Sequence, residues 1–164
     1  MSEQNEQSEQ NAQEQQPVFR LQKMYLKDLS FENPNAPDVF LGKGEPKVDV
    51  NLSLKQRKLE TPDHYEVILA ITANVTNSQT EKTLFVIEVE HAGVFLLKNI
   101  PEEHIAPILS VECPSLLFPF TRQIISQASV DGGFIPFLME PVNFMGLYEN
   151  SRRQQAAAQA AQEQ

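Results

Sequence analysis

The chain of 164 residues contains one cysteine, no tryptophan and no long apolar run. The single Cys113 cannot form an intramolecular disulfide, which excludes a small disulfide-held secreted scaffold and indicates a reducing, intracellular location. No segment approaches the roughly 20 apolar residues of a membrane-spanning helix, so we expect no direct membrane insertion. Basic residues are also few, 13 against 22 acidic ones, for a net charge of −9. This balance argues against nucleic acid as a partner, because phosphate binding needs a basic surface.

Motifs that carry catalytic chemistry are missing as well. The segment 42–44 (Gly-Lys-Gly) lacks the spacing of a phosphate-binding loop. The three histidines are scattered and no cysteine pair accompanies them, so we expect no metal site. Glu88 and Glu90 could form a carboxylate pair, but an open strand face offers no apolar wall to raise either pKa. The sequence therefore predicts no enzyme activity, no cofactor and no metal.

Both ends differ in composition from the middle of the chain. Residues 1–16 are rich in Gln and Glu, with no large apolar residue after Met1, which predicts a disordered tail. Residues 151–164 are rich in Gln and Ala and lack an apolar stripe, which predicts a tail that is partly helical or disordered. The remaining residues, 17–150, form one predicted domain. It holds 17 acidic and 11 basic residues, so most of the negative charge belongs to the folded part.

The first half of this domain has the pattern of β-strands. Residues 18–25 predict a strand, and the prolines and asparagines that follow predict an irregular connection over about 31–45. Residues alternate in side-chain character with the two-residue period of a strand over 47–55, 65–75 and 83–91. These segments predict a four-stranded antiparallel sheet with one buried and one solvent-facing side.

The second half has helical character. The predicted helix starts are Pro101, Pro119 and Asn143. Pro107 and Pro114 are expected to divide the intervening region into short pieces, and Gly132-Gly133 to end the longer helix. Strands followed by helices predict an α+β fold in which the helices pack on one face of the sheet.

The helix predicted from Pro119 is apolar on more than one side, whereas a small sheet covers only one side. A second copy of the chain is the simplest cover, which predicts a homo-oligomer. Alternatively, the short pieces around 105–111 cover this helix within one chain. The predicted oligomer interface comprises Phe19, Leu21, Phe120, Ile124, Ile125 and Ala128.

Two groups of surface residues suggest binding. Glu88 and Glu90 flank Val86 on the solvent-facing side of a strand, while Asp28 and Glu32 follow the first strand. Together they would make an acidic patch with an apolar spot, suited to a basic protein; the alternative is ordinary solvation of separate carboxylates. The loops also carry more aromatic residues than loops usually do. These either pack onto the domain or line an apolar groove for an extended ligand.

Three motifs resemble the SecB protein-export chaperone family. They are 25–32 (YLKDLSFE) with 34–37 (PNAP) and Val39-Phe40, then 113–120 (CPSLLFPF) with Arg122, and 141–144 (PVNF). The likeness extends in order from about Phe19 to Tyr148. It implies a cytoplasmic, ATP-independent holding chaperone that works as a homotetramer, a dimer of dimers. Such a protein keeps secretory precursors unfolded and delivers them to the SecA motor ATPase.

The resemblance also implies roles for particular residues. The motor-docking surface falls on Asp28, Glu32, Val86 and Glu88, to which we add the neighbouring Glu90. The zinc of this family belongs to the basic tail of the motor. The predicted client-binding groove comprises Leu29, Phe31, Val39, Phe40, Phe134, Phe137, Leu138, Met139, Phe144 and Tyr148. The family usually has a tryptophan near Gly44, and its absence here leaves one groove wall either missing or supplied by Phe40. The rival hypothesis is an acidic adaptor that docks one folded partner and holds no clients.

Overall fold

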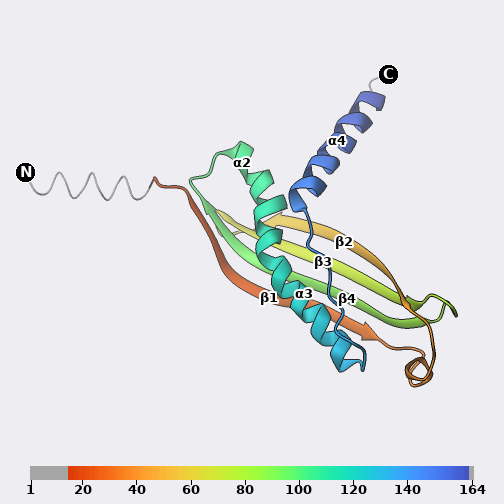
Figure 1. Cartoon of the computed structure of the whole chain (residues 1–164). Helices are drawn as coiled ribbons and strands as arrows, with labels where there is room; N and C mark the ends of the chain where they lie inside the picture. The colour runs from red at the N-terminus through yellow and green to blue at the C-terminus, as the bar shows by residue number, and fades with distance from the viewer. Residues whose placement is uncertain (1–14, 163–164) are drawn as a thin grey trace, which may run out of the picture.

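The computed structural model describes residues 15–162, so the predicted disordered tail lies almost entirely outside the described residues. The described chain forms one antiparallel sheet of four strands with helices over one of its faces (Figure 1). This arrangement agrees with the predicted α+β fold.

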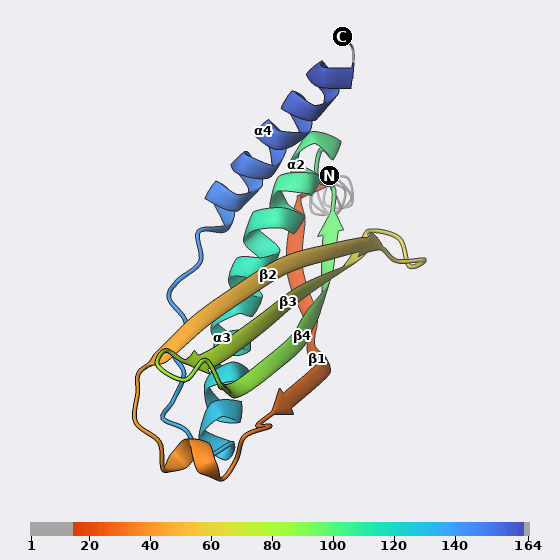
Figure 2. The same ribbon diagram turned by 90° about the vertical axis from the view of Figure 1, so that its right-hand side faces the viewer.

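The strands are β1 (Val18–Glu32), β2 (Pro46–Lys58), β3 (His64–Asn77) and β4 (Thr83–Lys98). Their order across the sheet is β1-β4-β3-β2, so β1 and β2 are the two edges. The connection between them contains a short 3₁₀ helix, η1 (Asp38–Phe40), and crosses from one edge of the sheet to the other (Figure 2).

Strand β1 is longer than predicted. Residues 28–32 continue the strand, with Leu29 opposite Val89 and Phe31 opposite Ile87 on β4. The expectation that the irregular connection starts at Phe31 is therefore wrong. No proline occurs over residues 18–33, so the pairing of β1 with β4 can continue to Glu32.

The predicted alternation is present in the two central strands. Leu69 and Ile71 of β3, like Ile87 of β4, are almost completely buried on the helix-covered face. Strand β2 differs, because Val48 and Val50 remain 44% and 38% exposed. An edge strand has a neighbour on one side only, and the helices do not extend fully over β2 (Figure 2).

The helices α2 (Glu102–Pro107), η2 (Ile108–Glu112, a π-helical turn) and α3 (Cys113–Asp131) follow one another without a break. The prolines divide this region into short pieces as predicted, since α2 ends at Pro107 and Pro114 follows the start of α3, but the pieces form one continuous helical path. Pro114 lies in the first turn of α3, where its missing N–H is not needed. Pro119 lies inside α3 and not at its start, because the burial of Leu117 and Phe118 outweighs the penalty of about 3 kcal/mol for an internal proline.

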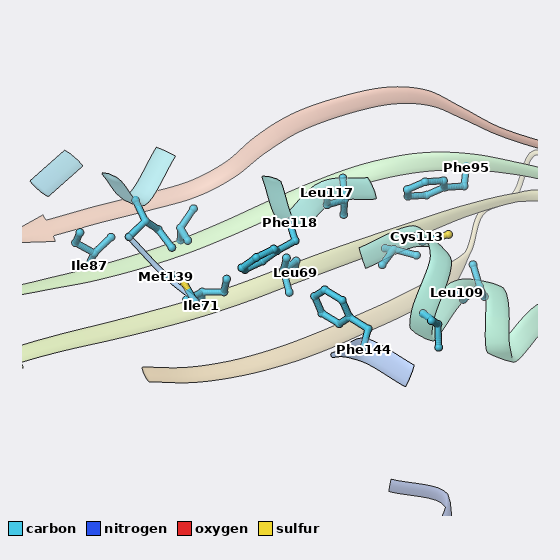
Figure 3. Close-up of a cluster of buried hydrophobic side chains, with 14 of the residues drawn as sticks. Leu69, Ile71, Ile87, Phe95, Leu109, Cys113, Leu117, Phe118, Met139 and Phe144 are labelled. Atoms are coloured by element: carbon cyan, nitrogen blue, oxygen red, sulfur yellow. The ribbon is translucent and has the colours of Figure 1, made fainter. Parts of the chain in front are cut away.

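The core lies between α3 and the sheet (Figure 3). Leu117, Thr121 and Ile125 repeat at four-residue spacing on α3 and are completely buried. The prediction that Ile125 belongs to an oligomer interface is therefore corrected, since its side chain faces the sheet of its own chain. Thr121 bonds to the buried His91 of β4 across 2.8 Å.

After Gly133, at φ +89°, an extended link returns along α3 toward α4 (Phe144–Gln162) (Figure 1). Asn143 caps α4 as predicted, accepting a hydrogen bond of 3.0 Å from the N–H of Gly146. The helix continues to Gln162, and all its residues from Glu149 onward are exposed. Among residues 15–162, no helix is both long and apolar enough to cross a membrane.

Candidate functional site

A groove runs along the edge strand β2, between its helix-side residues and the link with the start of α4. Three cavities of about 330, 420 and 370 Å³ follow one another here. The first two share Val48, and the third continues along β2 at Leu52 and Leu54. We call this the β2 groove. It is lined mainly by apolar side chains, which allows it to hold apolar segments of an extended ligand.

Packed aromatic rings close the first end of the groove. Phe85 lies at its base, 4.7 Å from Phe134 and 5.8 Å from Phe31 between ring centroids. Phe40 lies 5.2 Å from Phe134, and Phe137 contacts Phe85 edge-on at 6.3 Å. The two hypotheses for the loop aromatics therefore combine: the rings pack on the domain, and Phe134 and Phe137 also line the groove.

Large apolar side chains project at this same end. Leu138 of the groove lining is 63% exposed, and Ile135 and Leu41 are more than 80% exposed. Solvent-exposed apolar surface next to a groove is typical of a binding site.

The structure distributes the predicted groove residues over several places. Those that line the β2 groove are Phe134, Phe137, Leu138, Met139 and Tyr148. Phe31 and Phe40 support this lining through ring contacts, and Phe144 is buried against Phe118. Val39 lines a separate small cavity. Leu29 lies on β1, at the opposite edge of the sheet, so its prediction as a groove residue is corrected by the strand order.

The sequence did not indicate that β2 contributes to the groove. The residues concerned are Val48, Val50, Leu52 and Leu54. Their alternation was visible, but it predicted only a half-buried strand. Alternation identifies which side chains share a face, whereas the strand order decides whether that face is covered.

The predicted acidic residues gather on the uncovered side of the sheet. The β1–β4 register places Asp28 opposite Glu90, and Glu32 opposite Val86, with Glu88 between them. We call these five residues the acidic face. Within residues 15–162, Asp28, Glu32 and Glu88 form no salt bridge, whereas Glu90 pairs with Lys55 at 3.1 Å.

A buried carboxylate lies beside the acidic face. Glu66 of β3, only 4% exposed, accepts hydrogen bonds from Tyr25, Lys27 and Arg57; the last two measure 3.0 and 2.9 Å. These hydrogen bonds lower the pKa of Glu66 to about 2, and the bond from Arg57 has the largest effect. Burial, followed by the hydrogen bond to Glu66, raises the pKa of Tyr25 to about 12. We call these four residues the Glu66 cluster.

Three distant segments supply the Glu66 cluster, and no motif in the sequence indicated it. Its donors come from β1 and β2, on either side of β3 and β4. No spacing along the chain signals this arrangement, because it depends on the sheet order.

Most predicted oligomer residues lie at the surface between β1 and α3. Phe120 is 52% exposed on α3, and Phe19 is 40% exposed on β1, where it stacks on Phe95. Leu21, Ile124 and Ala128 are half-buried. Beside them, the second edge of β1 pairs with no strand of the described chain.

Two further titratable groups, His91 and Cys113, are buried. Burial lowers the pKa of His91 and, with the nearby Glu112 as a second cause, raises the pKa of the Cys113 thiol to about 12. A thiol with such a pKa is a poor nucleophile. Among residues 15–162, no three His, Cys, Asp or Glu side chains come together as a metal site would require.

A four-stranded antiparallel sheet covered on one face by helices is the fold of a SecB-like chaperone. One such chaperone from Mycobacterium tuberculosis, solved in complex with a ChAD peptide from the HigA1 antitoxin, superposes with a TM-score of 0.63. The alignment covers 76% of this chain and 91% of that chain, at 15% identity, so it shows the fold alone. The sequence gives the family: residues 12–155 match the preprotein translocase subunit SecB, and this chain belongs to the SecB family.

Curated relatives agree with this assignment. The protein-export protein SecB of Desulfotalea psychrophila is 61% identical over 140 residues, 85% of this chain and 89% of its own length. That of Magnetococcus marinus is 43% identical over 152 residues, 93% of this chain and 96% of its own length. The SecB family is a family of export chaperones and not a class of enzymes.

Proposed function

We propose that this chain holds unfolded secretory precursors in the β2 groove, without ATP, and delivers them to the SecA motor ATPase through the acidic face. The observation that carries the first part is the apolar groove, open along an edge strand and bordered by exposed side chains such as Leu138. Family membership supports it, and so does the peptide bound to the SecB-like chaperone of Mycobacterium tuberculosis.

Holding needs no chemical energy. A protein that binds only unfolded clients shifts their folding equilibrium by mass action, in proportion to its free concentration. Apolar burial is non-directional and contributes about 25 cal/mol per Å², so many different client sequences can bind in the same groove. Three successive cavities along β2 would let several client side chains bind at once.

For docking, the acidic face offers three carboxylates that are not neutralised by a neighbour: Asp28, Glu32 and Glu88. A basic segment, such as the zinc-bearing tail of the motor, would approach faster and bind more tightly through their field. Val86, half-buried and opposite Glu32 at one end of the acidic face, would supply an apolar contact.

We further propose a homotetramer arranged as a dimer of dimers. The unpaired edge of β1 and the exposed apolar residues Phe19 and Phe120 would be covered by other copies of the chain.

Client holding is tested by following the refolding of a slow-folding precursor with the chain in excess. We expect the wild-type chain to delay refolding and Leu138→Ser to shorten the delay severalfold, because a polar group replaces an exposed groove contact. Leu96→Ser, on the uncovered face of β4, is the matched control and should behave as wild type. Refolding that is not delayed by excess wild-type chain would contradict the proposal.

Motor docking is tested by the affinity of the chain for purified SecA. Glu88→Lys should weaken binding about tenfold at low salt, because it reverses one exposed charge; the loss should shrink above ~0.5 M salt. Client holding should be unchanged. Wild-type affinity at low salt would count against the acidic face. If unrelated unfolded chains also fail to compete for binding, while one folded protein binds, the adaptor hypothesis replaces the chaperone proposal.

A further inference from the structure

The Glu66 cluster and the acidic face share the uncovered side of the sheet. A register shift in β1 between Leu26 and Asp28 inserts one extra residue, Lys27. Asp28 lies opposite Glu90, while Lys27 bonds Glu66 on the same side of the sheet. A strand normally points successive side chains to opposite faces, so the bulge is what places Lys27 and Asp28 next to each other.

Glu66 determines where the Lys27 charge is held. Its two carboxylate oxygens lie 3.0 and 3.2 Å from the Lys27 ammonium, and the first also accepts from Arg57. Lys27 and Arg57 are partly exposed, with side chains 38% and 64% accessible, yet both bond to a carboxylate that is nearly buried. The remaining lone pairs of Glu66 accept the Tyr25 hydroxyl.

Without the Glu66 charge, two cations would lose their counter-ion beside the acidic face. Asp28 would then be the adjacent carboxylate available to Lys27, and it has no salt bridge of its own within residues 15–162. Opposite charges that approach within about 4 Å attract, and the exposed pair would cancel one of the three free acidic charges.

We propose that Glu66 is a positioning residue for the docking site: it holds Lys27 and Arg57 away from the acidic face and so keeps that face negative for a basic partner. Glu66 itself touches no partner in this proposal. The inference rests on the proposed docking function of the acidic face.

The test compares full-length variants for affinity toward purified SecA at about 20 mM and 0.5 M salt, a range over which screening of surface charges changes strongly. We expect Glu66→Gln to weaken binding about threefold or more at low salt and less than twofold at high salt, because it leaves two uncompensated cations. Adding Lys27→Met should restore the affinity to that of the Lys27→Met single variant. Tyr25→Phe removes a hydrogen bond but no charge, so it should bind as wild type.

A second readout compares the crystal structures of the variants. The Lys27 ammonium lies 3.0 Å from Glu66 in the wild-type chain, and in Glu66→Gln it should instead lie within about 4 Å of an Asp28 carboxylate oxygen. A merely structural role for Glu66 would not produce this signature. If Glu66→Gln does not fold, Glu66→Asp serves as the second variant, since its shorter side chain cannot reach both cations.

The inference is overturned if folded Glu66→Gln binds with wild-type affinity at low salt, or if Lys27→Met does not rescue it. These results can be distinguished from failure of the proposed docking function. If the acidic face does not dock SecA, Glu88→Lys would also leave the affinity for SecA unchanged.

Discussion

Two buried ionisable side chains, Glu66 and His91, make folding depend on pH for different reasons. The pKa of Glu66 is about 2 in the folded chain, below its ordinary 4.5, so its stabilisation is complete above pH 4.5 and is lost as the pH falls toward 2. Burial lowers the pKa of His91 from its ordinary 6.5. The folded chain therefore resists protonation of His91, and stability declines as the pH falls below about 6.5, where the unfolded chain takes up the proton.

The His91 effect is a prediction at this scale. The free energy of unfolding should decrease between pH 7.5 and 5.5, and His91→Gln should reduce that slope because glutamine does not titrate. The amide can also keep a hydrogen bond to Thr121, which now measures 2.8 Å. Urea unfolding at several pH values measures the slope. His64→Gln, at the half-buried first residue of β3, is the control, and equal slopes in wild type and His91→Gln would refute the assignment.

At the scale of elements, the turn that ends α3 connects the helix to the groove. Gly132 lies against Phe31, and a Cβ added there would come within 2.1 Å of its ring. Phe31 in turn stacks on Phe85, at the base of the groove. The side chain of Asn33 reaches the same turn, donating to the carbonyl of Gly132 at 3.3 Å. The end of β1, the end of α3 and the aromatic end of the groove are therefore one packed unit.

We predict that Gly132→Ala destabilises the chain by about 1–3 kcal/mol, since the added methyl group must displace Phe31. It should also weaken client holding by shifting Phe85. The matched control is Gly42→Ala, where the nearest atom to an added Cβ is 3.9 Å away. Urea unfolding and the refolding assay check both expectations, and equal stability of the two variants would contradict the packing argument.

At the scale of the whole molecule, both edges of the sheet are unpaired within residues 15–162. Long unpaired edges favour association, and the two edges here differ in what borders them. The β2 edge is bordered by the groove, whereas the β1 edge is bordered by exposed apolar residues of α3 such as Phe120. This difference assigns client binding to one edge and self-association to the other in our proposals.

We expect the mass in solution to be four times the 18.5 kDa of the chain. Phe120→Glu should lower the assembly state at micromolar concentration, because a charge would be buried in an apolar interface. Leu41→Glu, on an 86% exposed side chain of the β1–β2 connection, is the control and should leave the mass unchanged. Light scattering after size-exclusion chromatography distinguishes these outcomes, and a wild-type monomer would contradict the assembly proposal.

The sequence by itself determined the fold class and the alternation of the two central strands, because side-chain period follows directly from backbone geometry. It also placed the Asn143 cap and the helix end at Gly132-Gly133, which depend on a few neighbouring residues. Family membership followed from motifs that are contiguous in the chain, such as 113–120.

Only the tertiary structure decided features that depend on which strands are neighbours. In the order β1-β4-β3-β2, β1 pairs with β4 as far as Glu32, and Leu29 lies at the edge opposite the groove. Val48 and Val50, on the other edge strand, line the groove. The strand order also assembled the Glu66 cluster from three segments. Packing against the sheet decided that Pro119 lies within α3 and that Ile125 is core. In each case a long-range contact outweighed a local preference, because burial in the core contributes more free energy than the propensity of one residue.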